Sequence, residues 1–418
     1  MQAAVRYLIS LLARDEAAAG QVGYTANPAE YARYRLVIKP SGWLSTVAHP
    51  DTAPRPVPFL FDGVPALFGA PVSRREGTTL VVEADWVASA YYLVTRYEEW
   101  QCPRRDRHGR MSGRDSLLCR LGWLDRPLID AYSRQLRGLL GRQGVTVSPV
   151  PPGRVVLTHD IDSARRFRGL RPALGAVRRR QWALLWRALH GADPYADFEG
   201  VARLDGGLPA APSFFFAHVA GPTGCPEDAC CRPLSASDWE AARRLRWGVH
   251  FSALSAREPD RLPAERARLA RQCGAEPATC RFHYLMTPAP AGWRRLEECG
   301  ITDDYTLGFA DLPGFRLGTS RPVRYIDPLS GRVSERLTLH PLLLMDVTLS
   351  DYMRLPPGEA LAVSLRLCRE ALGEGGEAVL LWHNSSLAEG ADGYHRSLYA
   401  RLLDALAQES VGDPADAR

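Results

Sequence analysis

The chain has 418 residues, of which 46% are hydrophobic and 24% are charged, and its formal net charge is +5 at pH 7. These values are ordinary for a soluble globular protein and leave room for two or three domains with a sizeable core. The positive charge comes almost wholly from arginine, because Lys39 is the single lysine. The longest basic run, residues 178–180, is typical of a solvated helix face, and no basic stripe interleaves with aromatic residues, so no nucleic-acid partner is expected.

The hydropathy and cysteine patterns predict a cytoplasmic protein. No run of about 18 apolar residues occurs, so we expect no membrane span. Residues 1–18 are amphipathic but lack a small-residue cleavage site, which favours the first helix of a domain over a signal peptide. The nine cysteines are odd in number and scattered, which favours reduced thiols. Cys225, Cys230 and Cys231 form the one cluster, whose spacing matches no strong zinc pattern and leaves a structural metal site or a local disulfide open.

Residues 1–150 predict a small α/β domain. We expect helices at residues 1–18, 86–100 and 126–140 and extended segments at residues 34–38 and 79–82. Residues 101–115 are dense in Arg, Asp and Gly, which predicts a surface loop. The break at Pro149, Pro151, Pro152 and Gly153 is the expected domain boundary, and this half shows no catalytic spacing.

Residues 151–418 alternate strand-like and helical segments, as parallel strands with helical crossovers do. We expect strands at residues 155–158, 213–218, 248–251, 279–284, near 301, at 322–326 and at 378–382. We expect helices at residues 163–188, 237–245, 260–273, 291–299, 358–372 and 393–408. An incomplete (β/α) barrel and an open sheet both fit, and either one gathers its active site at the carboxyl ends of the strands.

The most informative stretch is residues 154–162, an apolar run that ends in His159, Asp160 and Asp162. In a strand Asp160 and Asp162 point to the same side, where their charges repel unless a cation or a shared proton intervenes. The alternative is a cap, in which Asp162 or Ser163 begins a helix from Ala164 onward.

Other polar residues fall at the same end of the predicted strands. Histidines follow four further strands, at His218, His250, His283 and His383, and Arg281 lies two residues before His283. A lone histidine there is more often a buried structural group, but together they suit a zinc-type ion with open positions for water and substrate. One of the two aspartates could bind the ion while the other takes a proton, His383 could protonate the leaving group, and Arg281 could orient the base. The sequence therefore favours metal-assisted hydrolysis of an amide or ester.

Five motifs carry a family resemblance: T-H-D-I-D at residues 158–162, G-V-H-F-S at 248–252, C-R-F-H-Y-L at 280–285, G-I-T-D-D-Y-T-L-G-F at 300–309 and L-L-W-H-N at 380–384. In this order they resemble the motif series of the polysaccharide deacetylases, the NodB-homology carbohydrate esterases. G-F-R-L-G-T-S at 314–320 and L-M-D-V-T-L at 344–349 look like one branch of that family. Residues 1–150, with R-Y-E-E-W at 96–100 and D-R-H-G-R at 106–110, are similar to the uncharacterised domain that precedes the deacetylase domain in that branch.

The resemblance implies an α/β chain in which a distorted (β/α)7 barrel at residues 151–418 follows a small α/β domain at residues 1–150. It implies removal of an acetyl group from an N- or O-acetylated sugar or glycan precursor, with a divalent metal, Zn2+ or alternatively Co2+ or Ni2+. At the matching positions Asp160 is the general base, His383 the general acid and Arg281 the residue that tunes the base. Asp304 lies in a segment that supports the site.

The same resemblance makes Asp162 and His250 metal ligands, but the second motif histidine is replaced by Leu254. We expect His283, which stands where the family commonly has proline, to be the third ligand, with His218 as the alternative and with packing beside Arg281 as the structural reading of His283. The backbone oxyanion donor of the family would map near Tyr284. Two other functions stay open: a glycan-binding or scaffold protein on a barrel that has lost its metal, and a C–N hydrolase of a small amide. The sequence gives no oligomeric state.

Overall fold

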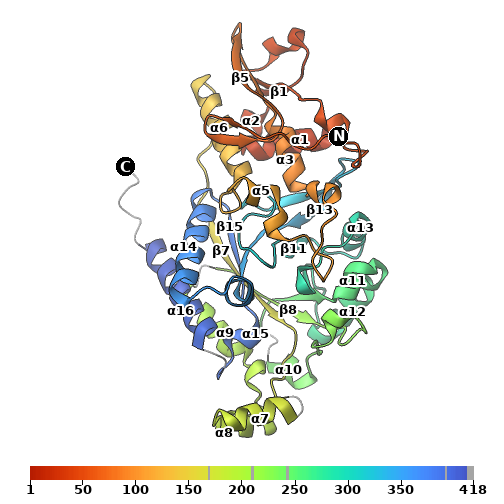
Figure 1. The fold of residues 1–418 in the computed structure, drawn as a ribbon, viewed down its shortest axis with the longest axis vertical. Helices are drawn as coiled ribbons and strands as arrows, with labels where there is room; N and C mark the ends of the chain where they lie inside the picture. Colours follow the sequence, from red (N-terminus) through yellow and green to blue (C-terminus); the bar gives the residue numbers. More distant parts are fainter. Residues whose placement is uncertain (168–169, 209–210, 242–243, 391–392, 412–418) are drawn as a thin grey trace.

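The computed structural model describes residues 1–167, 170–208, 211–241, 244–390 and 393–411. The molecule is elongated, with a small sheet at one end of its long axis and a large sheet in the middle (Figure 1). Two helices, α7 (Leu170–Arg178) and α8 (Trp182–Leu189), stand at the opposite end. None of the described helices has the length and hydropathy needed to cross a bilayer.

The small sheet contains four strands in the order β1-β2-β6-β5, with β5 antiparallel to its neighbour. Their bounds are β1 (Val22–Tyr24), β2 (Leu36–Ile38), β5 (Gly69–Glu76) and β6 (Thr79–Ala84). A separate hairpin joins β3 (Phe59–Phe61) to β4 (Val64–Ala66). The extended segments expected at residues 34–38 and 79–82 are β2 and β6.

The helices of this part are α1 (Gln2–Ala13), α2 (Glu16–Ala19), α3 (Trp86–Val94), α4 (Glu98–Gln101), α5 (Leu117–Arg120) and α6 (Leu128–Arg142). The prediction of single helices at residues 1–18 and 86–100 is wrong, because each breaks at a left-handed residue. Arg14 has φ 59° and Arg96 has φ 55°. Glycine usually marks such a C-terminal turn, and neither position carries one, so the breaks could not be predicted from residue type.

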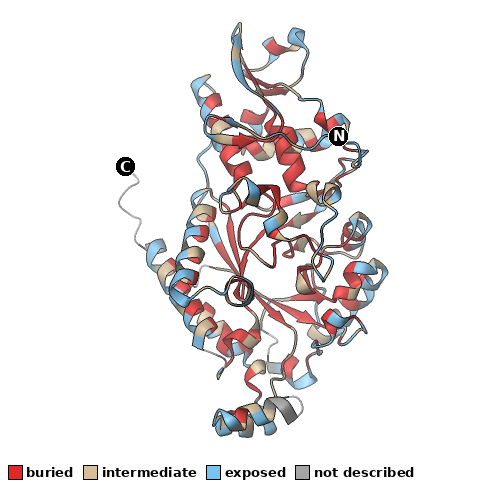
Figure 2. Ribbon diagram, viewed as in Figure 1, coloured by how far each residue is buried: buried red, intermediate tan, exposed pale blue. Residues whose placement is uncertain are grey.

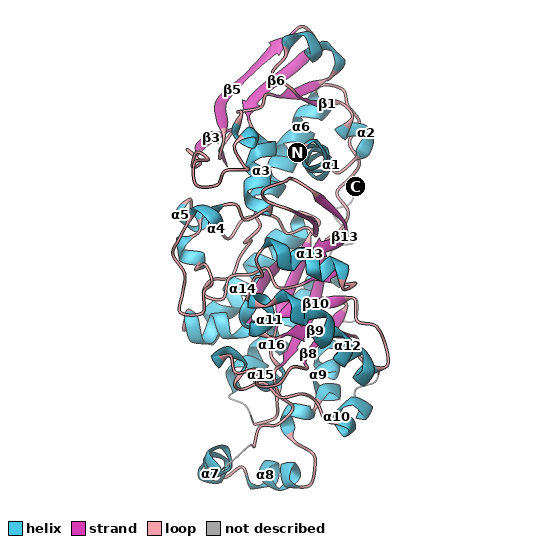
Figure 3. Ribbon diagram, turned by 90° about the vertical axis from the view of Figure 1, so that its right-hand side faces the viewer, coloured by secondary structure: helices cyan, strands magenta, loops and turns pink. Residues whose placement is uncertain are grey.

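The large sheet has nine strands in the order β12-β13-β11-β10-β9-β8-β7-β15-β14 and is curled (Figure 3). The strands are β7 (Arg154–Ile161), β8 (Ser213–His218), β9 (Trp247–Phe251), β10 (Thr279–Phe282), β11 (Asp303–Asp304), β12 (Val323–Ile326), β13 (Val333–Leu339), β14 (Leu342–Met345) and β15 (Glu377–Leu381). All run parallel except β12, which pairs antiparallel with β13. Most residues of these strands are buried, and Figure 2 shows the strands in red at the centre of the molecule. The mixed α/β prediction is confirmed.

The sequence missed β13 and β14 and misassigned the direction of the strand at residues 322–326. β13 carries polar residues at alternate positions, and it returns from β12 through a short turn in which Ser330 donates to Asp327. β14 is four apolar residues between two breaks, a run too short to identify by periodicity. The hairpin explains why β12 is antiparallel, because a connection this short cannot make a parallel crossover.

The helices around this sheet are α7, α8, α9 (Phe198–Asp205), α10 (Ala236–Ala241), α11 (Ala253–Arg257), α12 (Leu262–Cys273), α13 (Pro290–Glu298), α14 (Pro357–Gly373), α15 (Asn384–Leu387) and α16 (Gly393–Val411). Short 3-10 or π turns lie at η1 (Pro28–Arg33), η2 (Trp43–Ser45), η3 (Gly113–Asp115), η4 (Pro194–Ala196), η5 (Pro226–Asp228), η6 (Pro259–Arg261), η7 (His283–Leu285) and η8 (Thr348–Tyr352).

The single helix expected at residues 163–188 is wrong. β7 extends through Ile161, and the next described helix begins at Leu170, with residues 168–169 of the predicted helix outside the described part. Ser163 instead accepts a hydrogen bond from the Arg165 N–H at 3.2 Å, a local turn that competes with helix formation. Neither Asp162 nor Ser163 therefore caps a helix that begins at Ala164. The alternative interpretation of the Asp160–Asp162 pair as a helix cap is wrong.

A buried carboxylate joins the first 150 residues to the large sheet. Asp130 of α6 is fully buried and accepts hydrogen bonds from Ser320 N at 2.8 Å and Thr319 Oγ1 at 2.9 Å. The guanidinium of Arg321 donates to it at 2.7 Å, and Arg14 lies 3.8 Å away. The negative charge of Asp130 therefore offsets the free-energy cost of burying the Arg321 and Arg14 guanidinium groups.

We expect Asp130→Asn to destabilise the fold by about 3 kcal/mol, since it leaves Arg321 and Arg14 buried without a counter-charge. Urea unfolding followed by circular dichroism measures the difference. Asp125→Asn is the matched control, because Asp125 pairs with Arg366 at 2.6 Å on the exposed surface and its loss is expected to cost less than about 1 kcal/mol. Equal effects of the two substitutions would contradict the role given to Asp130.

Candidate functional site

The polar residues expected at the strand ends come together at the carboxyl edge of the large sheet. Asp160 and Asp162 lie at the end of β7, His250 on β9, Arg281 on β10, His283 just after β10 and His383 just after β15. These strands are neighbours in the order β10-β9-β8-β7-β15. The curl of the sheet turns their ends toward one another, so residues far apart in sequence share one site.

Arg281 fixes Asp160. The Arg281 side chain is fully buried, and its Nη1 donates to Asp160 Oδ1 and to Thr158 Oγ1, both at 2.9 Å. Its Nε donates to the Tyr305 carbonyl at 2.9 Å, and its guanidinium carbon lies 4.8 Å from the centre of the Phe216 ring. Because Arg281 is itself fixed by its other contacts, its charge-assisted hydrogen bond turns Asp160 Oδ1 toward the guanidinium and leaves Oδ2 facing His250 Nε2 at 3.6 Å.

Three electron-pair donors converge beside this pair. Asp162 Oδ1 lies 3.2 Å from both His250 Nε2 and His283 Nδ1, and the two histidine nitrogens are 3.1 Å apart. The opposite nitrogen of each ring faces a backbone carbonyl: His250 Nδ1 faces Arg281 O at 3.1 Å, and His283 Nε2 faces Glu227 O at 3.0 Å. A carbonyl only accepts, so the neutral rings carry their protons there and turn lone pairs toward Asp162.

This arrangement requires a positive charge at the point of convergence. Asp162 Oδ1 is buried and makes no hydrogen bond of good geometry. Burial lowers the pKa of His283, but the Asp162 carboxylate outweighs burial and holds that pKa well above its ordinary value. Burial likewise raises the pKa of Asp162, yet His283 and His250 hold it well below its usual range. A proton on His283 or a divalent cation can meet the requirement, and one carboxylate with two imidazoles is a donor set that suits zinc-type ions.

His283 lies where a second histidine nitrogen, which Leu254 cannot supply, could complete the set of three donors. Leu254 lies in the first turn of α11, where its backbone N–H donates to Asp228 Oδ2 at 3.2 Å. His218, the alternative, turns its Nε2 toward Asp228 Oδ1 at 3.6 Å, while its Nδ1 accepts from Gly221 N at 3.4 Å. The His218 ring lies 5.5 Å from that of His283, behind the three donors.

The cysteine cluster borders the same histidine. Cys231 Sγ is buried 3.3 Å from His283 Nε2, and Cys230 is exposed beside it. The two thiols and His283 form a second group whose ligand atoms lie within 4.8 Å of one another, and His218, Asp228 and Cys231 form a third. All nine cysteines are free thiols, Cys225 among them, where it contacts Glu227 at 2.7 Å. The local disulfide left open by the sequence is not formed.

His383 is paired with a carboxylate that sequence reasoning did not assign. Its Nδ1 lies 2.8 Å from Asp346 Oδ1, and its backbone N–H donates to Asp346 Oδ2 at 2.9 Å. Burial lowers the pKa of His383, but Asp346, with smaller effects of Asp162 and Asp160, raises it to about 10. Asp346 follows β14, a strand that was not predicted from the sequence. It lies in the run L-M-D-V-T-L, which is part of the family resemblance but did not predict a role for this carboxylate.

Asp304 lies on the other side of its strand. It accepts hydrogen bonds from Thr306 N and Thr306 Oγ1 at 3.1 and 2.6 Å and a weak one from the Cys280 thiol at 3.3 Å. Cys280 precedes Arg281, so its side chain points to the opposite face of β10. Asp304 thus fixes the β10–β11 edge and touches neither of the other carboxylates of the site.

Residues from the first part of the chain reach this edge of the sheet. Arg110, which is 8% exposed, donates to the Tyr284 carbonyl at 2.6 Å and to the Tyr352 hydroxyl at 3.1 Å. His108 Nδ1 lies 2.9 Å from Glu227 Oε1. Tyr284 has φ 57°, a left-handed conformation that is uncommon for a residue other than glycine. The surface loop predicted at residues 101–115 is present, with exposed residues at 103–105, 107, 109 and 114, but Arg110 is buried within it.

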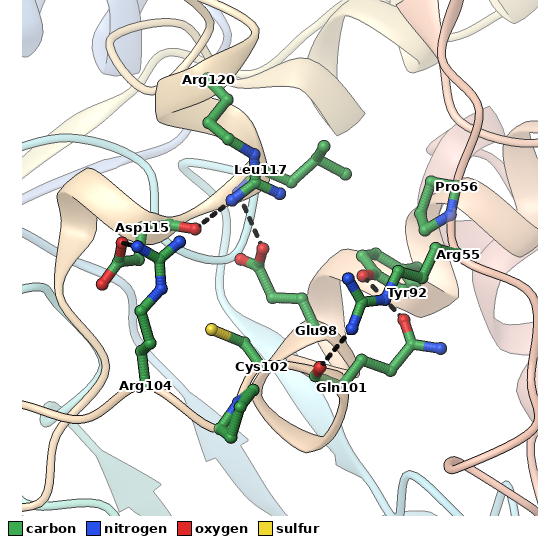
Figure 4. A pocket seen from close by; sticks show the side chains of 11 residues that line it. Arg55, Pro56, Tyr92, Glu98, Gln101, Cys102, Arg104, Asp115, Leu117 and Arg120 are labelled. Atoms are coloured by element: carbon green, nitrogen blue, oxygen red, sulfur yellow. Dashed lines mark hydrogen bonds and ion pairs between the residues drawn. The ribbon is translucent and has the colours of Figure 1, made fainter.

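A separate hollow of about 380 Å³ lies within the first 150 residues (Figure 4). Its lining includes Tyr92, Glu98, Gln101 and Arg120, and burial raises the pKa of Glu98 to about 7. Arg104 pairs with Asp115 at its edge at 3.1 Å. The hollow shares no lining residue with the strand-end site.

Residues 9–144 match the model of a family of unknown function, DUF7033. No curated protein matches the sequence. Among solved structures, a Mycobacterium smegmatis protein assigned as a polysaccharide deacetylase is similar at 16% identity and TM-score 0.39, over 63% of this chain and 86% of that one. A Bordetella bronchiseptica protein assigned as a polysaccharide deacetylase of O-antigen biosynthesis is similar at 16% identity and TM-score 0.30, over 63% and 82%. An allantoinase is similar at 12% identity and TM-score 0.38, over 60% and 83%.

Metal analysis tests the convergent donors. We expect about one divalent ion per chain after incubation with Zn2+ and dialysis, and near zero for Asp162→Asn, His250→Ala and His283→Ala, because each removes one of three donors. Plasma mass spectrometry measures the content. His218→Gln is the control and is expected to keep the ion. If His218→Gln loses the metal and His283→Ala keeps it, His218 and not His283 is the third ligand.

Proposed function

We propose that this chain is a metal-dependent hydrolase that removes an acetyl group from an N- or O-acetylated sugar or glycan precursor. One observation carries the proposal: a carboxylate fixed by a buried arginine and a histidine fixed by a buried carboxylate flank three convergent metal donors. This supplies a base, an acid and an electrophile site at one sheet edge, the parts that acyl hydrolysis requires. The choice of an acetylated sugar rests on the motif order.

In this proposal Asp160 is the general base. Arg281 keeps Asp160 Oδ1 occupied at 2.9 Å, which leaves Oδ2 to take a proton from a water molecule that attacks the acetyl carbonyl. Asp162, His250 and His283 would hold a divalent ion, Zn2+ or alternatively Co2+ or Ni2+. Such an ion, when bound, polarises a carbonyl and lowers the pKa of water.

His383 is the proposed general acid. Its proton on Nδ1 is held by Asp346, so Nε2 is the nitrogen that gives a proton to the leaving amine or alkoxide. The raised pKa keeps the ring protonated at neutral pH, which an acid requires at the start of the reaction. Asp304 acts at a distance, by fixing the edge on which Arg281 stands.

We also propose that residues 151–418 form the deacetylase-type (β/α)7 barrel and that residues 1–150 are a separate domain that completes its mouth. The contacts of Arg110 with Tyr284 and of His108 with Glu227 support the second statement, because both bring the first domain to the segments that carry His283. The Tyr284 backbone N–H is the proposed oxyanion donor, and Arg110 holds the turn that presents it.

Asp160→Asn tests the function. With Zn2+, Co2+ or Ni2+ and a panel of acetylated amino sugars and aryl acetates, we expect acetate release by the wild type and a loss of kcat of about 100- to 10,000-fold in the variant, without loss of metal. Asp125→Asn is the control for the chemical change. Absence of acetate with every metal, with sugar still bound, would favour a non-catalytic glycan-binding protein. Turnover of small cyclic amides alone would favour a C–N hydrolase.

Asp346→Asn tests the acid. The wild type is expected to lose kcat/KM only as pH rises through about 10, the pKa to which Asp346 raises His383. Without that carboxylate the pKa falls toward the ordinary value of about 6.5, so the alkaline limb moves to lower pH. The ratio of kcat/KM at pH 9 to that at pH 6 should drop by about tenfold or more. An unchanged profile would show that His383 is not the titrating acid.

A further inference from the structure

The helical pair α7–α8 exposes a stripe of large apolar side chains. Trp182, Trp186 and Leu189 are 58%, 62% and 76% exposed, and they follow at intervals of four and three residues, which places them on one face of α8. Leu184, on the opposite face, is buried at 8% exposure. The helix therefore packs on the protein with one side and presents tryptophan and leucine to the surroundings with the other.

Basic residues stand beside this stripe. Arg178 ends α7, Arg179 and Arg180 form the turn that follows, and all three are exposed. Leu174 of α7 adds a fourth apolar side chain at 58% exposure. Tryptophan, leucine and arginine on adjoining faces are the combination of helices that lie in the interface of an anionic bilayer, where the apolar face enters the acyl boundary and the arginines meet phosphate.

The pair is positioned to act as an anchor. It stands at the far end of the long axis, beyond the sheet (Figures 1 and 3). It is tied to the loop after α15 by hydrogen bonds from Arg166 Nη2 to Gly390 O at 2.7 Å and from Gln181 Nε2 to Gly390 O at 3.1 Å. Arg187 is paired with Glu389 at 2.6 Å and so faces the protein. In the chain the pair follows β7, which ends at Ile161, and α7 begins at Leu170.

We propose that the α7–α8 pair docks this protein on the surface of a membrane rich in anionic lipid, with Trp182, Trp186 and Leu189 inserted at the interface and Arg178, Arg179 and Arg180 on the headgroups. The basic residues favour an anionic membrane as the partner of this face. A second copy of this chain is a poorer partner, because two copies would bring like charges together. Docking turns the end of the molecule opposite the small sheet toward the bilayer. Docking involves none of the residues of the proposed reaction.

Sedimentation with vesicles tests this. Full-length protein should bind vesicles of phosphatidylglycerol and phosphatidylcholine, and bind phosphatidylcholine alone much more weakly. Replacing Arg178, Arg179 and Arg180 by Gln should weaken binding on the order of 100-fold, and high salt should do the same. Trp182→Ser with Trp186→Ser should weaken it by about tenfold or more.

Val57→Ser with Leu60→Ser is the matched control, because these side chains are 81% and 65% exposed and lie in or next to β3, far from α7 and α8 (Figure 3). It should bind vesicles as the wild type does. Circular dichroism of each variant verifies the fold, and light scattering without lipid reports its oligomeric state. No binding by the wild type, equal binding by the tryptophan variant, or a dimer that the tryptophan variant dissociates would each overturn the proposal. Because the readout is vesicle binding, it is decided independently of acetate release.

Discussion

The strand-end site depends on one electrostatic constraint. Asp162, His250 and His283 direct electron pairs at one point over distances of 3.1 to 3.2 Å, and the backbone carbonyls behind both rings prevent the histidines from turning their protons inward while neutral. Such a cluster is costly in a dry environment unless a cation or an extra proton joins it. The raised pKa of His283 and the lowered pKa of Asp162 have this common origin. A divalent ion that enters must displace the proton, so metal affinity should rise with pH.

The two aspartates differ because each has its own positive partner. Arg281 is permanently charged and fully buried, so Asp160 is compensated whether or not an ion is present. Asp162 has only the histidines. This difference supports the proposed roles of Asp160 as base and Asp162 as metal ligand better than their spacing does. A carboxylate whose charge is already neutralised by arginine gains less free energy from binding a metal ion. The same logic applies to His383, whose charge is matched by Asp346 on the opposite side of the site.

Much of this arrangement could be predicted because it follows from period two and from parallel strands. Asp160 with Asp162, and Arg281 with His283, lie two residues apart, and every parallel strand in such a sheet ends at the same edge. Asp346 and the Glu227 carbonyl could not be predicted in the same way. The first follows a four-residue strand without periodicity, and the second is a backbone group whose position depends on the path of a loop. Leu254, in place of the second motif histidine, left the third expected ligand open between His283 and His218, and only the fold shows that His283 Nδ1 lies 3.2 Å from Asp162 Oδ1 while His218 Nε2 faces Asp228.

Residues 106–110 illustrate why composition misleads in a chain rich in arginine. Arg110 looks like one more surface charge, yet it is buried against the turn at Tyr284 and Leu285, where two consecutive residues other than glycine have φ of 57° and 52°. Such residues cost about 1 kcal/mol each or more, and they persist only where neighbouring contacts enforce them. The hydrogen bond of Arg110 to the Tyr284 carbonyl, together with the guanidinium 5.7 Å from the centre of the Tyr284 ring, supplies that enforcement. The shape of the site beside His283 is therefore maintained by a residue that lies about 170 positions earlier in the chain.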